Sequence, residues 1–156
     1  MTGLKFKLAA IAFSALVLAR PGLTAENWPD SLDHYVAHVR NAIKTTDTAG
    51  YLAAVKNPNG ALLLDVREEA EYRTGHIPGT VDIPRGLLEF RIWRQLGYPG
   101  KVDLKKKIYV QCWGGNRAIL AAKQLQDIGF TNVTAVVMEL ADWQNKGYPF
   151  VDGESK

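Results

Sequence analysis

Short runs of apolar residues alternate along the chain with longer segments in which apolar positions recur every three or four residues. Continuous apolar runs are typical of strands buried on both faces of a sheet, and the longer spacing is typical of helices packed against it. The predicted strands lie at 61–66, 81–84, 107–111 and 133–137, and the predicted helices at 29–43, 48–55, 86–96, 116–129 and 139–146. This alternation predicts an α/β domain with a central, mostly parallel sheet flanked by helices on both faces.

The N-terminal segment differs from the rest of the chain. Two lysines precede an uninterrupted apolar run over 8–19, and a stretch of small residues ends at Ala25. This run is shorter than the roughly 20 residues that cross a bilayer as a helix, and Pro21 prevents its extension. The pattern predicts a signal peptide over 1–25, with cleavage after Ala25 or, as the alternative, after Ala19. We therefore expect a periplasmic or secreted protein with no stable membrane span after cleavage; a permanent anchor is the less favoured interpretation.

The positive charge of the chain belongs to that signal. The chain has 19 Lys and Arg against 16 Asp and Glu, and residues 1–25 contain Lys5, Lys7, Arg20 and no acid, so 16 residues of each sign remain. A neutral domain gives no electrostatic support for nucleic-acid binding, and no basic stripe with interleaved aromatic residues follows. We expect no nucleic-acid partner.

The remainder divides into a helical extension at 26–44 and one domain at 45–152. His34 and His38 lie four residues apart on the first predicted helix. Because no third ligand accompanies them, a solvent-exposed face is favoured over a metal site. We expect neither a metal nor an organic cofactor.

Cys112 is the only cysteine, so this predicted export product cannot form an intramolecular disulfide. It follows a predicted buried strand and precedes a helix, where parallel sheets place reactive groups. Gly114 and Gly115 allow backbone N–H groups to turn inward and join those of the helix N-terminus, so an anion would fit there. If that anion is the Cys112 thiolate, these dipoles and Arg117 stabilise it and make it a nucleophile. The alternative is a cysteine buried for packing beside an ordinary turn.

Three motifs in order resemble those of the rhodanese family. They are Leu64-Asp65-Val66-Arg67, the stretch from Glu71-Tyr72 to Gly75-His76-Ile77-Pro78-Gly79-Thr80, and Cys112-x-x-Gly115-x-Arg117; Trp143-x-x-x-Gly147-Tyr148-Pro149 is similar to the family's closing helix. The resemblance implies a rhodanese-like fold and a sulfurtransferase. It further implies that a loop cysteine carries a sulfane sulfur, as a persulfide, from a donor such as thiosulfate to a thiophilic acceptor such as cyanide or a thiol, including a protein thiol.

Carried over by position, the resemblance makes Cys112 the nucleophile and persulfide carrier. Backbone N–H groups of the following residues would cradle the outer sulfur; these are Trp113, Gly114, Gly115, Asn116 and Arg117. The supporting residues are Asp65, Arg67, Glu71 and His76. We expect Arg67 to bridge to an acid such as Glu71 and to fix the segment after the strand, and His76 to be a packed loop residue rather than a base.

Two other functions remain in view. Phosphatases and arsenate reductases of this fold resemble the pattern Cys-x5-Arg, whereas only four residues separate Cys112 from Arg117. The shorter loop forms a smaller ring of backbone N–H groups. Such a ring suits a single sulfur atom better than a tetrahedral oxyanion. A rhodanese module without turnover could instead carry or sense sulfur, or bind a partner through Trp93, Trp113 or the N-terminal helix.

The chain departs from the family pattern in front of its closing helix. Met138-Glu139 stands where the family usually has Gly-Gly, which we expect to alter the floor of the pocket. Between Cys112 and Arg117 the loop has no further base, so binding of dianionic thiosulfate needs charge from elsewhere. Three arginines after Pro84 could supply it, although an exposed helix face is the favoured interpretation; they are Arg85, Arg91 and Arg94.

Overall fold

A five-stranded sheet, parallel throughout, forms the centre of the protein in the computed structural model, which describes residues 30–153. Its spatial order is β1-β6-β5-β2-β4. The strands are β1 (Lys44–Thr46), β2 (Leu62–Asp65), β4 (Thr80–Asp82), β5 (Ile108–Gln111) and β6 (Val133–Val136). The predicted α/β class and parallel sheet are confirmed, and the predicted signal peptide lies outside the described residues.

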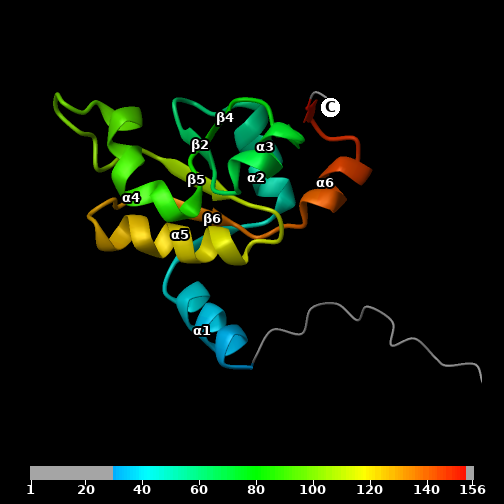
Figure 1. The fold of residues 1–156 in the computed structure, drawn as a ribbon, viewed down its shortest axis with the longest axis horizontal. Helices are drawn as coiled ribbons and strands as arrows, with labels where there is room; N and C mark the ends of the chain where they lie inside the picture. Colours follow the sequence, from blue (N-terminus) through cyan, green and yellow to red (C-terminus); the bar gives the residue numbers. More distant parts are fainter. Residues whose placement is uncertain (1–29, 154–156) are drawn as a thin grey trace, which may run out of the picture.

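Helices cover both faces of this sheet (Figure 1). The helices are α1 (Asp30–Asn41), α2 (Thr48–Lys56), α3 (Glu69–Arg73), α4 (Leu88–Arg91), α5 (Asn116–Asp127) and α6 (Leu140–Asn145), with 3-10 turns η1 (Arg85–Leu87) and η2 (Ile92–Leu96). Helices α1, α4 and α5 pack into one apolar core, and α2 and α6 into the other. Within the described residues, no helix combines the length and apolar character that a membrane crossing requires.

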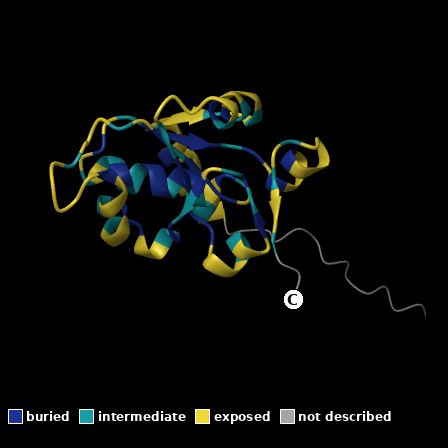
Figure 2. Ribbon diagram, turned by 90° about the horizontal axis from the view of Figure 1, so that it is seen from above, coloured by how far each residue is buried: buried dark blue, intermediate teal, exposed yellow. Residues whose placement is uncertain are grey.

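Successive strand residues point into opposite cores, as the pleat of a strand requires. On β2, Leu64 belongs to the α5 core and Leu63 to the α2 core; on β5, Val110 and Tyr109 divide in the same way. Figure 2 shows the buried residues gathered on these central strands and on α5. Cys112 lies in the α5 core, directly after β5.

The predicted helix over 86–96 is interrupted in the structure, where it consists of η1, α4 and η2. Leu88, Ile92 and Leu96 are all buried, so the apolar spacing that predicted a helix still faces the core. The carbonyl of Glu89 accepts a hydrogen bond from the indole of Trp93 at 2.5 Å. In a continuous α-helix that carbonyl would accept a hydrogen bond from the backbone N–H of Trp93. The indole N–H of Trp93 therefore competes with its backbone N–H for this carbonyl, at the point where the helix changes to 3-10 geometry.

Three short strands were not predicted. Strand β1 is polar, and it pairs in parallel with β6 at the edge of the sheet. Strands β3 (Gly75–His76) and β7 (Val151–Asp152) form a separate antiparallel pair. Helix α1 buries Val36 and Val39 and packs on α5, so it covers that face of the domain, while His34 and His38 are exposed.

Candidate active site

The Cys112 loop joins the carboxyl end of β5 to the start of α5. Cys112 is 2% exposed, and its Sγ accepts a hydrogen bond from the backbone N–H of Gly115 at 3.2 Å. Gly115 has a φ of 88°, and a Cβ there would lie 3.3 Å from the Cα of Val137. Glycine at 115 is therefore required both by the left-handed backbone and by the close approach of the segment after β6.

The geometry places a backbone N–H and a helix N-terminus at the sulfur of Cys112. The Gly115 N–H points at Sγ, and the N-terminus of the 12-residue helix α5 begins at Asn116. Backbone N–H groups and the positive end of a helix dipole both stabilise a thiolate relative to a thiol. The loop thus holds a sulfur atom in surroundings that suit a nucleophile.

Arg117, in the first turn of α5, pairs with Glu71 on α3. Its Nη1 and Nη2 donate to the two carboxylate oxygens of Glu71 at 2.6 and 2.7 Å. This bidentate bond is the main reason that the pKa of Glu71 is held below its usual value and that of Arg117 is raised. The pair ties the end of the cysteine loop to the segment after β2.

Arg67 bridges to an acid, as predicted, but that acid is Asp65 and the example named, the carboxylate of Glu71, is wrong. Its Nη2 lies 2.8 Å from Oδ2 of Asp65, and the two side chains are 1% and 0% exposed. Arg67 also donates to the carbonyls of Glu71 at 3.2 Å and Gly75 at 2.8 Å. Arg67 therefore fixes the segment after β2, as predicted, but through backbone carbonyls. The carboxylate of Glu71 is taken by Arg117, which reaches it from another element.

His76 lies in β3 and stacks on Tyr72. The two ring centroids are 4.0 Å apart with planes at 11°, and Nδ1 of His76 lies 3.3 Å from the carbonyl of Tyr72. Tyr72 donates its hydroxyl to the carbonyl of Thr80 at 2.8 Å. These contacts give His76 a packing role in the loop, and none of them reaches Cys112.

The segment after β6 forms one wall of the cysteine loop. The backbone N–H of Leu140 donates to the carbonyl of Trp113 at 2.8 Å. A Cβ on Gly114 would lie 3.1 and 3.2 Å from the two carboxylate oxygens of Glu139. The position at which the sequence departs from the family pattern therefore lies directly on the loop, and it places an acid there. Trp113 itself is 46% exposed beside the nucleophile.

The three arginines after Pro84 differ in their surroundings. The backbone N–H of Arg85 donates to the carbonyl of Val66 at 3.2 Å, which places Arg85 at the carboxyl end of β2, the edge where the Cys112 loop begins. Its Nε is buried and has no hydrogen-bond partner among the described residues. Arg91 and Arg94 are exposed, so the exposed-face interpretation holds for these two.

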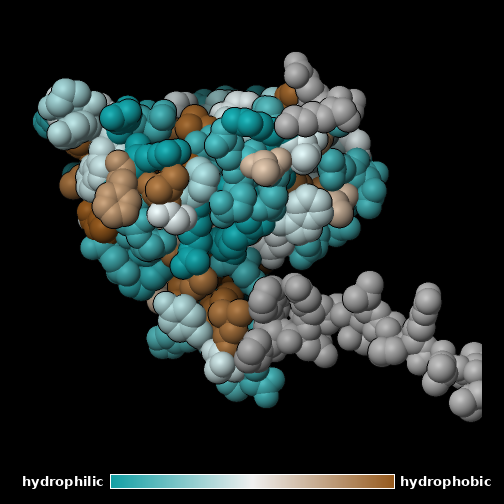
Figure 3. Space-filling view, viewed as in Figure 1, coloured by the Kyte–Doolittle hydropathy of each residue, from teal (hydrophilic) through white to brown (hydrophobic). Residues whose placement is uncertain are grey.

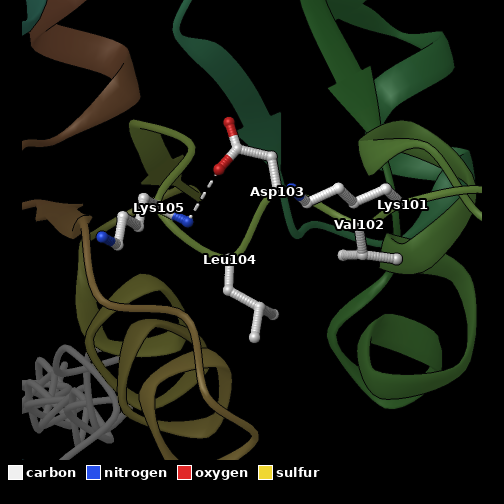
Figure 4. A pocket seen from close by; sticks show the side chains of 5 residues that line it. All are labelled: Lys101, Val102, Asp103, Leu104 and Lys105. Carbon is white, nitrogen blue, oxygen red and sulfur yellow. Dashed lines mark hydrogen bonds between the residues drawn. The ribbon is translucent and has the colours of Figure 1, made fainter.

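Two surface grooves lie on the connection from α4 to β5. Arg94 contributes to one of them, which is lined by Glu89, Phe90, Trp93, Arg94, Tyr98 and Val102, and Figure 3 shows apolar side chains gathered over this region. The other lies along 101–105, where Asp103 accepts a hydrogen bond from the backbone N–H of Lys105 (Figure 4). This segment leads into the amino end of β5, whereas Cys112 follows the carboxyl end.

Sequence reasoning named Asp65 but missed Asp82 and Gln111, which form a row of polar side chains with it on the α2 side of the sheet. Asp82, Asp65 and Gln111 are register partners on three adjacent strands. Burial, followed by the charges of Asp65 and Glu69, raises the pKa of Asp82 to about 6. The amide of Gln111 is fully buried, and neither of its polar atoms has a hydrogen-bond partner among the described residues. The sequence signal for this row is that each of three apolar strand runs ends in a polar residue.

The described residues 30–153 hold no group of three or more His, Cys, Asp or Glu side chains placed to bind a metal ion. The fold and the loop together define an α/β protein with a single cysteine in the loop that joins the carboxyl edge of a parallel sheet to the N-terminus of a helix.

Comparison with known proteins gives the family. A model of the rhodanese-like domain matches residues 47–146, so the chain belongs to the rhodanese-like domain family. The chain is 38% identical over 84 residues to a candidate sulfur carrier protein of Bacillus subtilis (strain 168), covering 54% of this chain and 42% of that protein. It is 31% identical over 101 residues to a thiosulfate:glutathione sulfurtransferase of Saccharomyces cerevisiae, covering 59% and 70%. Its relatives thus include both sulfurtransferases and sulfur carriers.

A solved structure extends the likeness over most of the chain. A protein of unknown function from Rhodopseudomonas palustris, described as a possible tyrosine phosphatase, superimposes with a TM-score of 0.65 at 27% identity. The alignment covers 82% of this chain and 99% of that protein. The rhodanese-like α/β fold, inferred above from three motifs, is confirmed.

Proposed function

We propose that the protein is a sulfurtransferase in which Cys112 carries a sulfane sulfur between a small donor and a thiol or cyanide acceptor. The observation that supports it most directly is the hydrogen bond from the Gly115 N–H to Sγ of Cys112 at 3.2 Å, at the start of α5. A backbone N–H at this position would stabilise both the thiolate and the persulfide anion, because each places one negative charge in the loop.

The proposed reaction has two displacement steps. The Cys112 thiolate attacks the outer sulfur of thiosulfate, the donor S–S bond breaks, and sulfite leaves with the electron pair. An acceptor thiolate or cyanide then attacks the outer sulfur of the Cys112 persulfide, which regenerates the Cys112 thiolate. The bond between Arg117 and Glu71 holds the end of the loop still through both steps.

The experiment is steady-state turnover with thiosulfate and either cyanide or a thiol, for the wild type and Cys112→Ser. Sulfite and the sulfurated acceptor should form in equal amounts with the wild type, and neither should form with the variant. Turnover that persists in Cys112→Ser would contradict the proposal, since Cys112 is the only cysteine in the chain.

A sulfur carrier without turnover is the second candidate. The burial of Cys112, which is 2% exposed, and the likeness to the Bacillus sulfur carrier both favour it. A carrier would take up one sulfur atom per chain and release sulfite once, without further product when a small acceptor is added. Such a protein would deliver the sulfur to a protein thiol instead.

Export is proposed on the sequence alone, from the apolar run over 8–19 and the small residues that end at Ala25. N-terminal sequencing of protein from a periplasmic or secreted fraction should begin at residue 26, or at residue 20 for the alternative cleavage. A full-length chain confined to the cytoplasmic fraction would contradict this proposal.

A further inference from the structure

Glu139 is the acid that the structure places on the Cys112 loop. We propose that Glu139 selects the sulfur donor, by disfavouring dianionic donors such as thiosulfate relative to alkyl persulfides, which carry at most one negative charge. The inference rests on the sulfur transfer proposed above and adds the charge class of the donor to it.

The backbone at residue 139 is held against the loop. The N–H of Leu140 donates to the carbonyl of Trp113 at 2.8 Å, and Met138 and Leu140 on either side of Glu139 are buried. Glu139 itself is exposed. Its side chain therefore extends into solvent from a backbone position that is held beside the loop. An incoming donor would meet the carboxylate there.

Gly114 leaves the space that this carboxylate occupies. A Cβ at position 114 would lie 3.1 Å from Oε1 and 3.2 Å from Oε2 of Glu139, which is closer than ordinary van der Waals contact. Both carboxylate oxygens therefore lie over the backbone of a residue two positions after Cys112. A side chain at 114 would push the carboxylate away from the loop.

The base of the loop itself, Arg117, is already paired and does not offset that acid. Arg117 is the only base from Cys112 to the first turn of α5, and Glu71 accepts one hydrogen bond from each of its terminal nitrogens, at 2.6 and 2.7 Å. Glu139 makes no ion pair among the described residues 30–153. A donor thus approaches Cys112 beside a carboxylate that has no ion-pair partner among the described residues, and the repulsion grows with the donor's own negative charge.

The two donor classes load the same product onto Cys112. With thiosulfate, the thiolate attacks the outer sulfur and sulfite leaves with the electron pair. With an alkyl persulfide, the thiolate attacks the terminal sulfur, the S–S bond breaks, and the alkyl thiolate leaves and takes up the proton of the persulfide. In both reactions Cys112 ends as the persulfide anion, so a difference in loading rate reports on the approach of the donor.

The test compares loading rates from thiosulfate and from 2-hydroxyethyl persulfide for wild type, Glu139→Gln and Asp142→Asn. Asp142 is an exposed acid on α6, the helix that Glu139 precedes, and its removal changes the net charge equally. We expect Glu139→Gln to raise the second-order rate constant for loading from thiosulfate by roughly three- to tenfold at low ionic strength. The gain should shrink as salt rises, because salt screens exposed charges. The rate of loading from the persulfide in Glu139→Gln should stay within about twofold of the wild-type rate. In Asp142→Asn, the loading rates from thiosulfate and from the persulfide should both stay within the same limit.

Charge reversal provides a second test. Glu139→Lys should raise the rate of loading from thiosulfate further than Glu139→Gln does. Equal thiosulfate rates in wild type and Glu139→Gln would overturn the inference. So would an equal change for both donors, because a structural role predicts that result. If neither donor places sulfur on Cys112 in any variant, the proposed function itself fails, and that outcome is distinct from unaltered selectivity.

Discussion

Two arginines of this protein form ion pairs in very different surroundings. Arg67 and its partner Asp65 are almost completely buried, whereas Arg117 and Glu71 are each about one-third exposed, at 32% and 33%. Arg67 also donates hydrogen bonds to two backbone carbonyls, so it fixes the conformation of the segment after β2. Arg117 binds only a carboxylate in the hydrogen bonds that the described residues show, and it lies five positions after Cys112. The first pair is thus part of the fold, and the second positions the loop.

The largest effect should follow from removing the acid of the buried pair. Asp65→Asn leaves the Arg67 guanidinium buried without a counter-charge, which costs about 3–5 kcal/mol of stability in comparable cases. Urea unfolding followed by circular dichroism measures this loss. Glu69→Gln is the matched control, since its exposed pair with Arg73 should contribute no more than about 1 kcal/mol. Equal losses in the two variants would contradict the distinction between buried and exposed pairs.

Asp82 sharpens the comparison, because it is the register partner of Asp65 on the neighbouring strand. Its pKa is raised from 3.8 to about 6, so the folded state binds a proton more tightly than the unfolded state. The protonated carboxyl therefore favours folding below pH 3.8, and that advantage is lost as pH rises through 6. Asp82→Asn should stabilise the protein at pH 7.5 by up to about 1 kcal/mol, after allowance for solvent screening, and less at pH 4. A thermal melt at each pH checks this; greater stabilisation at the lower pH would contradict it.

The exposed pair should give a smaller change in stability and a clear change in rate. Glu71→Gln should cost within about 1 kcal/mol at pH 7. The pKa of Glu71 is lowered, so its contribution is present above 4.5 and is lost as pH falls through the folded value. Because Arg117 loses its charged anchor, sulfur loading of Cys112 should slow by roughly tenfold. A stable variant that loads sulfur at the wild-type rate would remove Arg117 from the positioning of the loop.

Sequence patterns predicted the central elements because their causes are local. The apolar runs at 61–66 and 107–111 and the amphipathic segment at 116–129 correspond to β2, β5 and α5 within two residues at each end. Strand β1 and the β3–β7 pair escaped prediction because segments of two or three residues without an apolar run become strands only through their partners.

The same division applies to the site. The loop from Cys112 to Arg117 was predicted because its glycines and the helix start are neighbours in sequence. The partner of the Glu71 carboxylate was not predicted. Arg67 lies four residues from Glu71 and Arg117 lies 46 residues from it, and sequence spacing favours the nearer base. Burial decides the outcome, since Arg67 is fully engaged by Asp65 and by backbone carbonyls.

Intact-mass spectrometry of the wild type and Cys112→Ser, before and after incubation with excess thiosulfate, tests the central proposal most directly. A persulfide on Cys112 predicts a gain of one sulfur atom in the wild type, reversed by a thiol reductant, and no gain in the variant. An unchanged wild-type mass, in a protein whose Cys112 is alkylated by a small reagent, would contradict sulfur transfer from this donor through Cys112.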